Sequence, residues 1–163
     1  MVKDGTPNAL TFGIYPGSAV GDTGPSGPPD RPDQINQALD WLQGSPGRPF
    51  IVRAYDLYAG QGDTARATIR QTPAGHHRYP GSGRRLDLVA QYHSRSGDID
   101  GYCAFIEKPI DRHGERIATL QIGEEPNITG NPLLDGACPR ITEALIAGVR
   151  AARDKARRSG HRA

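Results

Sequence analysis

Two adjacent carboxylates stand directly after an apolar segment and directly before a proline. Glu124, Glu125 and Pro126 follow residues 117–123, a short apolar run of the kind that forms a buried strand. Two carboxylates this close repel each other, and the repulsion raises the pKa of one of them. A carboxylic acid with a raised pKa can donate a proton near neutral pH, so the pattern is compatible with a general acid.

Strand periodicity adds further side chains to this candidate site. Because side chains alternate between the two faces of a strand, Glu125 is expected on the same face as Gln121. The same rule pairs Arg53 with Tyr55 in an earlier apolar segment and directs His93, at the end of a third one, to this face. We therefore expect four side chains to converge at one mouth: Arg53, Tyr55, His93 and Glu125.

Each of these residues also has a purely structural interpretation. Arg53 is as well suited to pairing with a carboxylate of the sheet as to binding a substrate. His93 is compatible with a histidine whose hydrogen bonds are met within its loop, and Glu124 and Glu125 with surface acids before a turn. Tyr55 would either stack on a ligand or pack at the rim.

The sequence predicts no metal site and no cofactor. His76 and His77 are adjacent, but they lie in a segment rich in glycine and proline and have no third ligand nearby. Cys103 and Cys138 have neither CxxC spacing nor a histidine cluster beside them, so one disulfide and two buried thiols both remain open.

The elements that would position the site alternate between strands and helices. Four short apolar segments bounded by turn residues are typical of parallel strands covered on both faces: residues 9–15, 49–55, 86–92 and 117–123. Helical periodicity follows three possible start signals, Asp30, Asp98 and Pro139. Pro109 predicts a kink or an early end of the second helix, because proline lacks the backbone donor and clashes with the previous turn.

Two long segments without a clear periodic pattern follow the first two strands. Residues 17–29 and 58–85 are rich in glycine and proline, and the second has room for at most one short helix around residues 64–70. Loops of this length in a domain are usually functional or disordered. In parallel α/β folds, loops at the carboxyl ends of strands form the binding surface.

Residues 117–127, a strand ending in Glu125-Pro126-Asn127, resemble the fourth strand of retaining glycoside hydrolases built on a (β/α)8 (TIM) barrel. Those enzymes carry an Asn-Glu-Pro triplet there, and its Glu is the general acid/base. The preceding turn, residues 113–116, and polar residues ending earlier strands add to the likeness, which covers most of the chain as strands one to four. The fold class implied is α/β, with residues 1–163 as a single domain forming the N-terminal half of a TIM barrel.

The resemblance implies a role for each candidate residue. Glu125 would be the general acid/base, and five residues would bind substrate: Glu124, Arg53, His93, Tyr55 and Asn127. Glu124 replaces the Asn that hydrogen-bonds a sugar hydroxyl in the family, and its carboxylate can still accept a bond from that hydroxyl. The implied partner is a carbohydrate.

Retaining hydrolysis needs a second carboxylate roughly 5–5.5 Å from the acid/base, and in the family it lies on the seventh strand. A complete barrel takes about 250 residues, and the 163 residues here carry only four predicted strands. Our first hypothesis is that the chain is part of a longer glycosidase and is inactive alone. The alternative is a non-catalytic half-barrel that self-associates or binds glycan. A doubly wound domain that binds an anion is a weaker third, because no GxGxxG or GxxxxGK[ST] motif occurs.

Composition excludes several other classes of protein. Glycine (21) and proline (14) are frequent but below the level typical of disordered chains, and no apolar run is long enough for a membrane span. The net charge of +2 favours no nucleic acid partner, and the basic residues of 150–162 are better explained as the C-terminal end of a helix. No secretory signal follows Lys3, so the compartment is open, with the cytoplasm as the default expectation.

Overall fold

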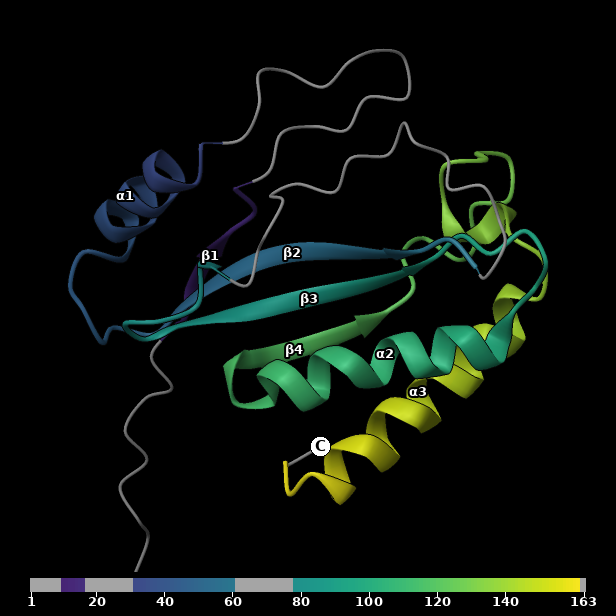
Figure 1. The fold of residues 1–163 in the computed structure, drawn as a ribbon. Coiled ribbons are helices and arrows are strands. Elements are labelled where there is room, and N and C mark those ends of the chain that lie inside the picture. The colour runs from purple at the N-terminus through teal and green to yellow at the C-terminus, as the bar shows by residue number, and fades with distance from the viewer. Residues whose placement is uncertain (1–9, 17–30, 61–77, 162–163) are drawn as a thin grey trace, which may run out of the picture.

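The computed structural model describes residues 10–16, 31–60 and 78–161, which form a mixed α/β structure. Strands and helices alternate along these residues (Figure 1), with two short 3-10 helices after α2 and before α3. The elements in chain order are β1 (Phe12–Ile14), α1 (Pro32–Gln43), β2 (Phe50–Tyr58), β3 (Arg84–Tyr92), α2 (Ile99–His113), η2 (Gly114–Arg116), β4 (Ile117–Ile122), η3 (Asp135–Ala137) and α3 (Ile141–Arg158).

The four strands form one parallel sheet in the order β1-β2-β3-β4. Each strand therefore pairs with the next one along the chain, and each connection returns to the same end of the sheet. This confirms the predicted parallel sheet, and the arrangement is compatible with half of an α/β barrel. β1 is shorter than predicted, whereas β2 continues to Tyr58.

The core lies between the sheet and its helices. Strand side chains at alternate positions are buried on this side, among them Val52 of β2 and Leu88 of β3, with Leu39 of α1 in the same apolar cluster. A second cluster joins Tyr92 at the end of β3 to Ile106 of α2. Burying these side chains supplies most of the stabilisation, about 25 cal/mol for each Å² of apolar surface removed from water.

Among the described residues, the opposite face of the sheet is only partly covered, which differs from the predicted strands buried on both faces. Thr119 and Gln121 of β4 are exposed, and Arg53 and Tyr55 of β2 are half-buried. We call this side of the sheet the polar face. On β2 and β4 the polar face is exposed or half-buried, whereas on β3 Val89 and Gln91 are buried on this face as well.

The helix boundaries agree with only part of the sequence signals. Asp98 caps α2 by accepting a hydrogen bond from the Gly101 backbone at 2.9 Å. Pro109 does not end that helix, which continues to His113. α3 begins two residues after Pro139, and the predicted cap Asp30 lies outside the described residues.

α2 and α3 lie alongside each other next to β4 (Figure 1). Gly148 makes the close packing possible, because a Cβ there would lie 2.8 Å from side-chain atoms of both Ile106 and Ile122. Two of the basic residues near the end of α3 pair with α2: Lys155 with Asp111 at 2.6 Å and Arg158 with Glu107 at 3.1 Å. These contacts support the interpretation of the basic segment as a helix end.

Three further predictions have simpler outcomes. Cys103 and Cys138 are both free thiols, so the disulfide alternative is not observed. No described helix is long and apolar enough to cross a bilayer. Most of the two long loops, including His76, His77 and the short helix expected around residues 64–70, lies outside the described residues.

Candidate functional site

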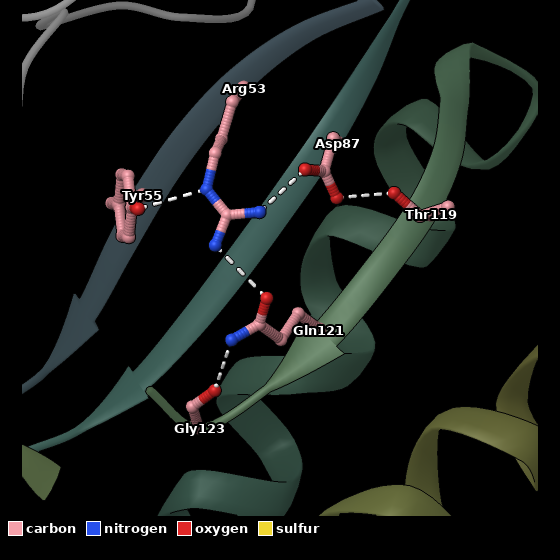
Figure 2. A network of polar contacts seen from close by, with 6 residues as sticks. All are labelled: Arg53, Tyr55, Asp87, Thr119, Gln121 and Gly123. Carbon is pink, nitrogen blue, oxygen red and sulfur yellow. Dashed lines mark hydrogen bonds and ion pairs between the residues drawn. The ribbon is translucent and has the colours of Figure 1, made fainter. Parts of the chain in front are cut away.

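The polar face carries a network of hydrogen bonds across three neighbouring strands (Figure 2). Arg53, Asp87 and Thr119 stand in register on β2, β3 and β4, so their side chains form one row. Arg53 Nη1 lies 2.6 Å from Asp87 Oδ2, and Thr119 donates to the other oxygen of Asp87. The next row adds Tyr55, whose hydroxyl accepts from Arg53 Nε at 2.8 Å, and Gln121, whose Oε1 accepts from Nη2 at 3.0 Å.

The guanidinium of Arg53 is held by side chains on all three strands. All three of its nitrogens donate to side chains of the network, and the group also lies 5.1 Å from the centre of the Tyr55 ring. Burial alone would lower the pKa of Arg53, but the hydrogen bonds to Tyr55 and Asp87 raise it. Of the two roles that the sequence left open, the geometry favours the ion pair with a sheet carboxylate.

Glu124 connects the end of β4 to β2 and β3. Its Oε2 accepts a hydrogen bond from Gln91 Nε2 at 2.6 Å, and its carboxylate also interacts with the Tyr55 hydroxyl. Burial raises the pKa of Glu124 above its ordinary value, and the negative charges of Asp135 and Glu125 raise it further. Tyr55 and Arg53 act in the opposite direction but do not cancel this effect.

Glu125 departs from the alternation expected of it. β4 ends at Ile122, and Gly123 takes a left-handed conformation with φ +77°, so the two-residue period stops before the carboxylates. Glu125 also has positive φ, +46°, and its side chain is exposed. The carboxylate that meets Tyr55 is consequently Glu124, one residue earlier than predicted. Asn127 is exposed in the turn that follows.

His93 follows the end of β3 as predicted, but its side chain faces Asp135 rather than the expected Glu125. Its Nε2 lies 3.2 Å from Oδ1 of Asp135, and its side chain is only 9% exposed. The ring of Tyr55 packs edge to face on the ring of Tyr15, with the two ring centres 5.1 Å apart. The structure thus brings Arg53, Tyr55 and Glu124 together, whereas His93 lies against Asp135.

Sequence reasoning missed two carboxylates of this region. Asp87 could have been found from strand alternation, since it lies an even number of residues before His93, which is expected on this face. Asp135 lies in the irregular segment before α3, where no periodic pattern indicates burial, yet its side chain is completely buried.

The described residues contain no group of three or more His, Cys, Asp or Glu side chains that could hold a metal ion. Comparison with family models, with curated proteins and with solved structures found no match to this chain. The site must therefore be interpreted from its own geometry and chemistry.

Proposed function

We propose that this chain carries the acid/base half of a retaining glycoside hydrolase site on the first four strands of a (β/α)8-type barrel. The observation that supports it best is the position of Glu124 and Glu125 just after the end of β4, with Glu124 beside polar groups of β2 and β3. Ligand sites of parallel α/β folds lie at this edge of the sheet. The substrate is a carbohydrate, and no cofactor takes part.

The two carboxylates have different surroundings and therefore different roles in this proposal. Glu125 is exposed and can approach a glycosidic oxygen as the general acid/base. Glu124 is held by Gln91 and Tyr55, so it is suited to accepting a hydrogen bond from a sugar hydroxyl. Arg53 keeps Tyr55 in place rather than binding the sugar itself.

The nucleophile belongs to a part of the site outside these strands. Retention needs a second carboxylate about 5–5.5 Å from the acid/base. Two further carboxylates lie near Glu124 or in the network, and neither is available: Asp87 is bound by Arg53 and Thr119, and Asp135 is completely buried. We therefore expect the chain alone to bind glycosides without hydrolysing them.

Saturation-transfer NMR with a panel of aryl glycosides tests this proposal. We expect binding by the wild type, equal binding by Glu125→Gln, and weaker binding by Glu124→Gln, which loses the charged acceptor. Glu115→Gln is the control, because Glu115 is exposed in η2, before β4 begins. Failure to bind any glycoside would overturn the proposal. Hydrolysis that depends on Glu125 would instead show that the described strands already hold a complete site.

A second candidate is a half-barrel without catalytic activity that pairs with another copy of itself. It is favoured by exposed apolar side chains at both open sides of the sheet: Phe12 and Ile14 on β1, and Ile146 and Val149 on α3. Such side chains are commonly covered in an assembly. The oligomeric state distinguishes the two candidates.

A further inference from the structure

A completely buried carboxylate lies beneath the turn that carries Glu124 and Glu125. Asp135, the first residue of η3, has a side-chain exposure of 0%. Its Oδ2 accepts a hydrogen bond from the Glu124 backbone N–H at 2.8 Å. The side chain thereby holds the main chain at the point where β4 has ended and strand pairing no longer supports it.

The other oxygen of Asp135 faces a histidine from a different strand. His93 Nε2 lies 3.2 Å from Asp135 Oδ1, within ion-pair distance, and both atoms are buried without a hydrogen bond to any described residue. The backbone of His93 is itself held, because its N–H donates to the Tyr58 carbonyl at 2.8 Å. Asp135 is therefore fixed from the end of β3 and in turn fixes the end of β4.

Close packing of two glycines also holds the turn that carries Glu124 and Glu125 against η3. Gly136 packs so closely on the turn after Glu125 that a Cβ there would lie 2.6 Å from the Ile128 carbonyl oxygen and 2.8 Å from that of Pro126. At Gly123, a Cβ would lie 3.3 Å from Asp135 Oδ2. Residues 123–128 are thus packed around η3, with Asp135 at the centre.

A buried carboxylate is costly unless its oxygens are paired, and an apolar side chain would usually fill the space at lower cost. The arrangement is explained if the carboxylate is needed for orientation. We propose that Asp135 and His93 are a positioning pair that sets the conformation of the Glu124–Glu125 turn and thereby the placement of both carboxylates. What the two carboxylates do rests on the proposed function, whereas their positioning by this pair does not.

Asp135 also acts on Glu124 through its negative charge. The negative charge of Asp135 raises the pKa of Glu124, in addition to the larger effect of burial. The other charged or titratable groups that affect Glu124 are Arg53 and Tyr55 of β2, which lower its pKa, and Glu125, which raises it. Tyr102 of α2 also feels the charge of Asp135. Removing that charge should therefore shift the titration of Glu124 to lower pH.

Two NMR measurements on the full chain test the pair without any sugar. In Asp135→Asn, which keeps the size of the side chain, we expect the carboxyl carbon of Glu124 to titrate closer to the ordinary pKa of 4.5. In Asp135→Ala, exchange of the Glu124 amide hydrogen should accelerate by about tenfold or more, as expected when a hydrogen bond to a charged acceptor is lost. The Val89 amide in β3 should change only as much as global stability does.

The histidine provides a second pair of variants if changes at Asp135 prevent folding. His93→Gln can still present a donor toward Asp135, so it should retain slow exchange of the Glu124 amide, whereas His93→Leu should lose it. Asp154→Asn, an exposed carboxylate on α3, is the control. Equal changes at all amides, or a Glu124 titration identical in wild type and Asp135→Asn, would overturn the positioning role. Absence of glycoside binding by the wild type would overturn the proposed function only.

Discussion

At the scale of single residues, the polar face separates two kinds of charged side chain. Arg53 and Asp87 satisfy each other and three neighbouring side chains, so their charges are balanced within the sheet. Glu124, by contrast, is held by the neutral side chains of Gln91 and Tyr55. Burial, together with the negative charges of Asp135 and Glu125, raises the pKa of its carboxyl group, which therefore keeps a proton to higher pH than an ordinary glutamic acid.

This difference predicts how stability depends on pH. The folded protein binds the Glu124 proton more tightly than the unfolded chain, because burial raises the pKa above 4.5. Stability should therefore fall as pH rises from about that value through the raised pKa of the folded state. The Glu124→Gln variant should not show this fall and should be more stable than wild type at neutral pH, because it removes a charge that is disfavoured by burial. Urea unfolding between pH 4 and 8 measures it.

Glu143 provides a control of opposite sign. Its hydrogen bond from Arg140 lowers the pKa of its carboxyl group, so its contribution to stability is present above the ordinary pKa and is lost as the solution becomes more acidic. Glu143→Gln should thus be less stable than wild type above the ordinary pKa and should approach wild type as the solution becomes acidic. If Glu124→Gln and wild type lose stability in parallel from pH 4 to 8, Glu124 has no raised pKa in the folded protein.

At the scale of elements, the end of β4 decides which carboxylate joins the network. The backbone of Gly123 has φ +77°, a conformation that costs other residues about 1–2 kcal/mol. A Cβ at this position would also lie 2.6 Å from Leu145 Cδ2 of α3. The glycine therefore allows the chain to leave the sheet and to place Glu124 beside Gln91.

We predict that Gly123→Ala destabilises the protein by about 1–2 kcal/mol through the strained backbone alone. The contact with Leu145 adds to this cost. Gly130→Ala is a matched control, since no atom lies within 4 Å of its added Cβ and its φ is not positive. Denaturant unfolding of both variants gives the comparison, and equal stabilities would show that Gly123 can be replaced without strain.

At the scale of the whole molecule, β1 and β4 are the two edge strands of the sheet that the described residues form. Phe12 on β1 is 60% exposed although its register partner Phe50 is buried, so it lies on the helix side without cover from a described helix. Ile146 and Val149 are exposed on α3 at the other side of the sheet. The two apolar surfaces would face each other if two copies closed into one eight-stranded arrangement.

Sedimentation velocity over a range of concentrations tests this association. If the second candidate function is correct, the wild type forms dimers, and the double variant Ile146→Lys with Val149→Lys shifts toward monomer because it places charges in the interface. Gln37→Lys, which adds a charge on the exposed surface of α1, should behave as the wild type. A wild type that remains monomeric at every concentration would rule out the self-pairing candidate.

The sequence was sufficient for the features that depend on local patterns. The apolar segments correctly predicted four parallel strands, because the strand face that packs on the helices needs apolar side chains at alternate positions. The Asp98 cap and the shared face of Arg53 and Tyr55 follow from equally local rules of helix capping and strand alternation. The helical pattern of α2 even outweighed Pro109, because its apolar face is buried against the sheet.

Only the tertiary structure decided how the carboxylates are arranged. The alternation that predicts the face of Gln121 ends where β4 ends, so it could not predict that Glu124, rather than Glu125, reaches Tyr55. The burial of Asp135 beneath this turn depends on contacts with His93, which is far away in the sequence. The sequence by itself therefore determined the strands and the polar face that they share, whereas the geometry of the site arises from long-range packing around the end of β4.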